Sequence, residues 1–135
     1  VARNSAISYG HPATLCPLDT KNHCSEKWHQ ALSVFIDRNN NKIFEPQFQE
    51  VIVAYKAEIK PNDSLQYGKG RKGVTYSPTG YLAGWGQNGT FKYCPNHHLN
   101  FSRGVIVATS GRVYKTYQTN SGIDKTRRYQ TITCR

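Results

Sequence analysis

The stretch that decides the fold is RGVIVATSGRVYKTYQ, residues 103–118. Residues Val105 to Ala108 form a short apolar run rich in β-branched side chains, which favours a strand buried on both faces. Thr109-Ser110-Gly111 interrupts the run, and glycine can adopt the positive φ that a tight turn requires. Residues from Arg112 to Gln118 then alternate between the two faces of an extended chain. The stretch predicts a central β-hairpin with one arm in the core and one arm that carries cations and tyrosines to the surface.

Other short apolar or alternating segments predict further strands. They lie at residues 13–15, 31–36, 50–59, 74–76, 89–94 and 129–134. The segment 50–59 has the clearest alternation and predicts a half-buried antiparallel strand. On this prediction Val51, Val53 and Tyr55 lie on the face that is turned to the core of the domain. The turn signal Ser77-Pro78-Thr79-Gly80 separates the segment 74–76 from Tyr81-Leu82.

The first nine residues predict the end of a helix. Ala2, Ala6 and Ile7 are spaced as on one helical face, and Gly10 followed by Pro12 ends the pattern. Nine residues alone would not hold a helix, so we expect this one to begin upstream. A chain that opens on Val1 and contains no methionine is expected to have been trimmed. One helix and many short strands predict an α+β fold that is mostly β.

Length and charge limit the function classes. With 135 residues the chain fits one domain, and it has no run near the roughly 20 apolar residues of a membrane span. Residues 1–58 carry six basic and six acidic side chains, whereas residues 59–135 carry twelve basic side chains against Asp63 and Asp124. The net charge of +10 therefore belongs wholly to the second half. Such asymmetry favours a polyanionic partner, and a solvated basic face is the alternative.

The four cysteines are Cys16, Cys24, Cys94 and Cys134, and four cysteines allow three pairings. We favour Cys16–Cys24, which closes a small loop, and Cys94–Cys134, which fastens the C-terminus. A zinc site is the alternative, although neither pair has the usual spacing and Cys94-x-x-His97-His98 is an incomplete ligand set. Disulfides would indicate an oxidising compartment.

Catalytic and cofactor motifs are absent from the sequence or incomplete. There is no G-x-S-x-G motif, and Tyr67 to Gly73 is rich in glycine and lysine but does not match the phosphate-binding loop. A D-x-N-x-N pattern starts at Asp37 as in a calcium loop, but Lys42 replaces the expected glycine and Phe48 the expected glutamate. A secreted basic nuclease could use two of the five histidines with a lysine. The histidines are His11, His23, His29, His97 and His98. We predict no enzyme, no metal and no cofactor.

The opening residues ARNSAISYGHPATLCP resemble the helix end and first strand of the GspH/FimT-type minor pilins and pseudopilins. A pattern like ARSEAI-x-x-G-x-x-V-T-L-C-P is common in that family. Further matches follow in the family's order, and the chain looks most like FimT/FimU of the type IV pilus. They are Trp28, the strand 34–37 with its Asn-rich turn, the turn 76–80, Gly89-Thr90-Phe91 before Cys94, and VIVATSGR at 105–112.

The resemblance implies a pilin-like globular head of antiparallel sheets packed on the tail of an N-terminal helix. Residues 1–9 would be the C-terminal end of that helix, and residues 10–135 the β-rich head. The missing part of the helix would anchor the subunit in the inner membrane, with the head in the periplasm, before incorporation into the extracellular pilus. The implied partners are other minor and major pilins, and the implied role is pilus assembly at the tip.

Some FimT relatives bind DNA during natural transformation through a C-terminal G-R-x-R-x-R pattern. This chain matches only Gly111 and Arg112, because Tyr114 and Thr116 fill the next two arginine positions, with Lys115 between them on the opposite face. Other nearby cations could replace the missing arginines, and we predict weak, non-specific DNA binding by this C-terminal face. The predicted DNA-binding residues are Arg103, Arg112, Lys115, Lys125, Arg127, Arg128 and Arg135.

Three alternatives to DNA binding remain at this point. The chain could be a purely structural minor pilin, or a type II secretion pseudopilin with no nucleic-acid role. Its basic face could equally meet anionic lipid or a neighbouring acidic pilin. The basic nuclease is the third alternative.

Overall fold

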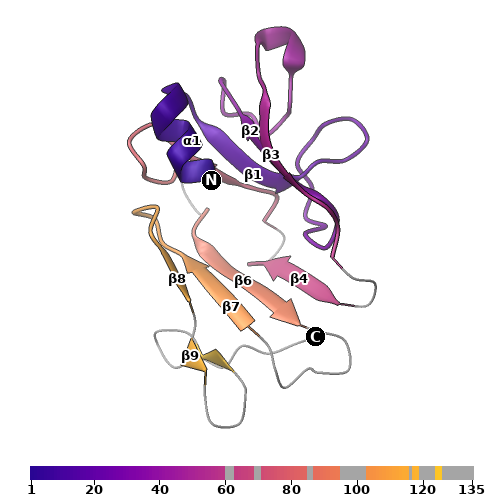
Figure 1. Ribbon diagram of the computed structural model, residues 1–135, viewed down its shortest axis with the longest axis vertical. Helices are drawn as coiled ribbons and strands as arrows, with labels where there is room; N and C mark the ends of the chain where they lie inside the picture. The colour runs from indigo at the N-terminus through magenta and orange to yellow at the C-terminus, as the bar shows by residue number, and fades with distance from the viewer. Residues whose placement is uncertain are drawn as a thin grey trace.

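The protein, described here from a computed structural model, consists of two antiparallel β-sheets and one short helix (Figure 1). The structure describes residues 1–59, 63–68, 71–84, 87–94, 103–115, 117–118 and 124–125. Sheets dominate and one helix packs on them, so the predicted α+β, mostly β fold is confirmed. In Figure 1 the two sheets lie one above the other, with α1 against the upper one.

Helix α1 spans Ala2–Tyr9 and ends where the sequence predicts. Gly10 follows it with φ 70° and donates its backbone N–H to the carbonyl oxygen of Ala6, as in a left-handed helix cap. Ala2 and Ala6 are the buried residues of α1, and the helix packs on β1, β2 and β5. Two small side chains one turn apart let the helix lie close to the sheet.

The first sheet has the strand order β3-β2-β1-β5. Its strands are β1 (Ala13–Pro17), β2 (Leu32–Ile36), β3 (Ile52–Lys56) and β5 (Val74–Tyr76). Leu15 pairs with Val34 on one side and with Val74 on the other, so these apolar side chains share one face. Thr14 pairs with Phe35 and Thr75 on the opposite face, which is also buried.

The second sheet has the strand order β4-β6-β7-β8. Its strands are β4 (Ser64–Tyr67), β6 (Gly89–Cys94), β7 (Arg103–Val107) and β8 (Val113–Lys115). A short 3-10 helix, η1 (Pro46–Phe48), precedes β3, and β9 (Tyr117–Gln118) pairs with β10 (Asp124–Lys125). The consecutive pairing of β6, β7 and β8 forms a three-stranded meander, which contains the predicted hairpin.

Trp28 joins the two halves of the core. Its side chain is buried, and its indole Nε1 donates a 2.7 Å hydrogen bond to the backbone oxygen of Arg71. Its ring meets Tyr67 and Phe91 edge-on, at centroid distances of 5.4 and 5.1 Å. One aromatic cluster thus fastens the second sheet to the loop before β2.

The predicted hairpin is present, with a correction to its burial. β7 pairs with β8 in antiparallel register, and Gly111 in the turn has φ 86°. However, Val105 and Ile106 are only half-buried, so the prediction of a strand covered on both faces is wrong. Val105 lies on the face of the second sheet that is turned toward the first sheet. Even on that face it is not fully covered, because it lines a groove between the sheets.

The alternation predicted for residues 50–59 is also wrong. Val51 is 43% and Tyr55 68% exposed, although both were expected to face the core. β3 is the edge strand of its sheet, and its pairing shifts between Val34 and Phe35. The extra residue at this bulge breaks the period of two that the sequence pattern assumes.

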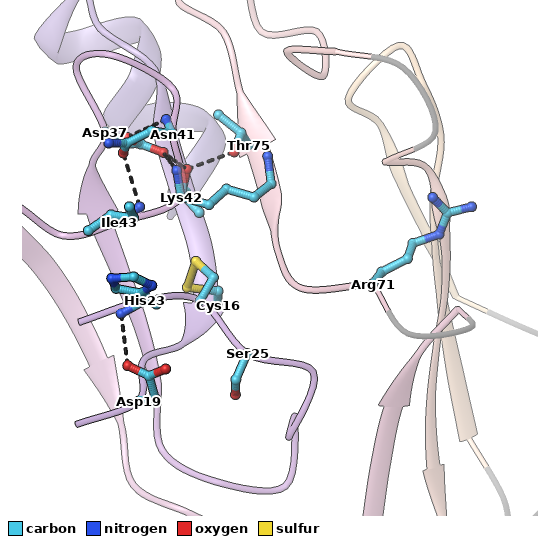
Figure 2. The surroundings of a disulfide bond; sticks show 12 residues. Cys16, Asp19, His23, Ser25, Asp37, Asn41, Lys42, Ile43, Arg71 and Thr75 are labelled. Carbon is cyan, nitrogen blue, oxygen red and sulfur yellow. Dashed lines mark hydrogen bonds between the residues drawn. A yellow bond between two sulfur atoms is a disulfide. The ribbon is translucent and has the colours of Figure 1, made fainter. Parts of the chain in front are cut away.

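The structure contains the predicted disulfide between Cys16 and Cys24. Figure 2 shows its surroundings, with the loop around Asp37, Asn41 and Lys42 beside it. Cys94 is not a free thiol in the structure, but Cys134 lies outside the described residues. The pairing of Cys94 with Cys134 therefore stays a prediction.

Candidate functional site

An apolar groove of about 630 Å³ opens between the two sheets at the N-terminal end of α1. Side chains from α1, from all four strands of the first sheet and from β6, β7 and β8 line it. Val1, Tyr55 and Val113 lie in this lining and are 76%, 68% and 55% exposed. Among the described residues of the lining, the charged ones are Arg3 and Lys56, and none is a carboxylate. The groove is therefore an open apolar surface with a positive rim.

At one end of the groove, three distant parts of the chain meet in a junction formed by Arg3, Gly80 and Gly111. The Nε of Arg3 donates a 3.1 Å hydrogen bond to the backbone oxygen of Gly80. A Cβ added to Gly111 would lie only 1.9 Å from that same oxygen, so the two glycine segments are in direct contact. Helix α1, the turn after β5 and the hairpin turn after β7 are thus held together.

Two further hydrogen bonds hold this junction. The hydroxyl of Tyr76 donates to the backbone oxygen of Gly111 at 3.1 Å, and burial raises the pKa of this phenol. The tyrosine therefore keeps its proton, and remains a donor, at neutral pH. The backbone N–H of Leu82 donates to the oxygen of Thr109 at 3.1 Å.

Two of the predicted DNA-binding residues are exposed on the second arm of the hairpin. Arg112 directly follows the junction, and Lys115 ends β8. Lys115 pairs with Val105 and Tyr114 with Ile106, so Lys115 and Tyr114 occupy opposite faces of the sheet. The structure therefore separates Lys115 from the face of Tyr114, as the alternation indicates.

Arg103 does not join Arg112 in one cluster. It starts β7, where it pairs with Tyr93, whereas Arg112 follows the turn at the other end of that strand. The four residue steps of β7 correspond to roughly 13 Å. Lys125 lies in β10, where its backbone pairs with Tyr117.

The remaining predicted cations, Arg127, Arg128 and Arg135, lie outside the described residues. In the part of the chain that the structure describes, Arg112 and Lys115 are exposed on the same arm but, by the alternation of the strand, on opposite faces, so the predicted basic face stays a prediction.

Three residues near this face were missed by sequence reasoning. Arg3 reaches from α1 to Gly80 in the turn that contacts the hairpin, Lys56 lies on β3 in the lining of the groove, and Tyr81 follows Gly80 with 59% of its surface exposed. The helical pattern of residues 1–9 predicts only that Arg3 lies in a helix. No local signal connects it with a turn 77 residues away.

The calcium-like loop is occupied by its own hydrogen bonds. Asp37 is fully buried, and its Oδ2 accepts from the Thr14 hydroxyl and the Lys42 N–H, both at 2.9 Å. Its Oδ1 accepts from the Asn41 N–H at 3.1 Å (Figure 2). Burial lowers the pKa of Lys42, and the neighbouring Asp37 charge opposes that shift. The pattern at Asp37 thus serves to fix a turn.

A second carboxylate braces the same loop from its other end. Glu50 accepts from the backbone N–H groups of Arg38 at 2.9 Å and Glu45 at 2.8 Å, and burial raises its pKa. No group of three or more potential ligands that could hold a metal occurs within the described part of the chain. Two of the histidines considered for a nuclease, His97 and His98, fall outside that part.

Comparisons with known proteins agree with this architecture. The family model described as type II transport protein GspH matches residues 1–111. Two crystal structures of the Pseudomonas aeruginosa type IV minor pilin FimU are similar in fold. One has a TM-score of 0.61 at 17% identity, covering 91% of this chain and 85% of that chain. The other has a TM-score of 0.62 at 16% identity, covering 91% and 81%.

A search of curated proteins returns no significant match. Within the described residues, no helix combines the length and the apolar character needed to cross a bilayer.

Proposed function

The chain belongs to the GspH family of minor pilins and pseudopilins, and from that membership we propose that it takes part in assembling the type IV pilus. In this role the head joins other minor pilins at the pilus tip to the major subunits. It requires surfaces for neighbouring subunits and no catalytic chemistry. The family and the likeness in fold to FimU support it.

The observation that carries the proposal is the apolar groove at the start of α1. Val1 lies in its lining, and in Figure 1 the N-terminal end of α1 points toward the second sheet. A helix continuing upstream from Val1 would pass over this groove and remove apolar side chains such as Phe91 and Val105 from water. Residues 1–9 would then be the end of a long pilin helix that anchors a periplasmic head (10–135) in the inner membrane before assembly.

Loss of the protein tests the assembly role. In a strain without the gene we expect fewer surface pili and reduced twitching, because the subunits at the tip would lose a connector. Electron microscopy of whole cells gives the number of pili, and the gene supplied in trans should restore it. A deletion strain with pili and motility equal to the parent would refute the assembly role.

We further propose that the basic face binds DNA weakly and without sequence preference. In the described residues its support is the exposed cations Arg112 and Lys115, on opposite faces of the second arm of the hairpin, and Arg3, which donates to Gly80 in the turn that contacts the hairpin turn. The excess charge of residues 59–135 adds Lys125, Arg127, Arg128 and Arg135 from the sequence that follows. The described residues of the basic half form strands and present no helix for reading bases, so phosphate contacts would dominate the affinity.

A titration at two salt concentrations tests DNA binding. If four cations contact phosphates, affinity should fall about 100-fold between 50 and 200 mM salt, because each contact contributes about 0.9 to the logarithmic slope. We expect micromolar affinity and equal binding of unrelated sequences. Replacing Arg112, Lys125, Arg127 and Arg128 by glutamine should abolish most of the binding.

Lys21→Gln with Lys27→Gln provides the control, since both lysines are exposed on loops of the balanced first half. This control should bind as the wild type does. Binding that is insensitive to salt, or equal in the quadruple variant, would exclude the DNA role and leave assembly alone. In that case a structural minor pilin or a secretion pseudopilin would be the better description.

A further inference from the structure

We propose that Tyr81, Arg3 and Arg112 form a site for single-stranded DNA, in which the tyrosine ring stacks on an unpaired base between two guanidinium groups. The proposal rests on the proposed DNA role and specifies its site and its ligand. It places the strongest contact at the junction end of the groove, with residues from three separate parts of the chain.

The position of Tyr81 is fixed by its backbone. The N–H of Ser77 donates to the oxygen of Tyr81 at 2.8 Å, and the N–H of Gly80 donates to the oxygen of Ser77 at 2.9 Å. The next residue, Leu82, is hydrogen-bonded to Thr109 in the hairpin turn. Tyr81 nevertheless keeps 59% of its surface exposed. A large aromatic ring that is exposed on a hydrogen-bonded turn is suited to stacking. Because the backbone of the turn is already ordered, binding costs little further conformational entropy.

Both cations lie close to one backbone oxygen, that of Gly80: Arg3 binds it directly, and Arg112 is one residue away from the contact. Arg3 donates its Nε to the oxygen of Gly80, the residue before Tyr81, and remains exposed. Arg112 follows Gly111, which touches the same oxygen. Consecutive α-carbons are about 3.8 Å apart, so each guanidinium can reach the surroundings of the tyrosine ring.

The site favours a single strand over a duplex. The faces of paired bases are covered by their neighbours in a duplex, whereas an unpaired base can place a face on an aromatic side chain. The phosphates on either side of such a base would meet Arg3 and Arg112. Among the described residues that line the groove beside Arg3, none is a carboxylate that would repel the backbone.

The experiment compares three ligands of 12 nucleotides by fluorescence anisotropy: oligo-dT, a duplex, and an abasic phosphodiester strand. The wild-type chain should bind oligo-dT tighter than the duplex. Tyr81→Ala should weaken oligo-dT binding by roughly 10-fold, whereas Tyr81→Phe should bind as the wild type does. The abasic strand should bind the wild type about as weakly as oligo-dT binds Tyr81→Ala.

Tyr9→Ala is the matched control, because Tyr9 is a similarly exposed tyrosine at the C-terminal end of α1, outside the lining of the groove. It should leave all three affinities unchanged. Arg3→Gln and Arg112→Gln should each reduce the logarithmic salt slope for oligo-dT by about 0.7. Tyr81→Ala with wild-type affinity, or a duplex bound tighter than the single strand, overturns this site while leaving non-specific DNA binding in place. A wild-type chain that binds none of the three ligands overturns both proposals.

Discussion

Replacing Gly111 by alanine is expected to lower the free energy of unfolding by about 3 kcal/mol, because two separate penalties combine. Gly111 has φ 86°, which costs an alanine on the order of 1–2 kcal/mol. The new Cβ would also lie 1.9 Å from the backbone oxygen of Gly80, and a backbone atom cannot rotate away as a side chain can. The hairpin turn would have to leave the junction, which would also break the hydrogen bond from Tyr76. Chemical denaturation followed by circular dichroism measures the loss.

Gly10→Ala separates the two penalties. Gly10 has a similar φ of 70°, but a Cβ there would meet nothing within 4 Å. We therefore expect this control to lose only about 1 kcal/mol. An equal decrease in the free energy of unfolding in the two variants would show that the close contact between Gly80 and Gly111 adds nothing to the cost of the substitution.

Asp37→Ala is expected to cost about 3–5 kcal/mol, because a buried carboxylate that serves three donors would be removed. The Thr14 hydroxyl and the N–H groups of Asn41 and Lys42 would all lose their acceptor in a site closed to water. The half-buried Lys42 ammonium would also lose the neighbouring negative charge. The loop beside the Cys16–Cys24 disulfide should loosen, which hydrogen exchange of the amides of Asn41 and Lys42 would detect.

Asp19→Ala is the matched control for this prediction. Asp19 also accepts two backbone N–H groups, from Lys21 at 2.8 Å and His23 at 3.0 Å, and these bonds lower its pKa. The residue is fully exposed, so water can replace the lost acceptor. The control should therefore lose much less stability than Asp37→Ala. Similar losses would show that burial of Asp37 is not what makes its hydrogen bonds important.

Features that depend on neighbours in sequence could be predicted. The end of α1 follows from Gly10, and the hairpin turn follows from Gly111 after a β-branched run. Strand β6, Gly89–Cys94, has the bounds that its alternating residues indicate. In each case the local pattern and the final packing favour the same conformation.

Features that depend on distant contacts could not be predicted. Strand β4 ends in Tyr67, whose ring packs against Trp28 and Phe91, and the glycine-rich sequence after Tyr67 gives no local sign of either the strand or this contact. The bulge in β3 reversed the expected exposure of Val51, since a pattern of alternation carries no information on pairing.

The candidate site was found only in part for the same reason. Arg112 and Lys115 could be identified from the charge of the hairpin, and both are exposed. Arg3 and Tyr81 enter the site through contacts at Gly80 that bring together residues far apart in the chain. The D-x-N-x-N pattern at Asp37 resembles the start of a calcium loop in sequence. In the structure the Asp37 oxygens accept hydrogen bonds from Thr14 and from the backbone of their own loop.

The proposal that this chain is a pilus subunit is tested most directly by mass spectrometry of sheared and washed pili. The proposal predicts peptides from residues 10–135 in the pilus fraction, at a small fraction of the amount of the major subunit. It also predicts that the Gly111→Ala variant is depleted from this fraction while Gly10→Ala is retained. Pili rich in the major subunit but without peptides of the wild-type chain would contradict the proposal.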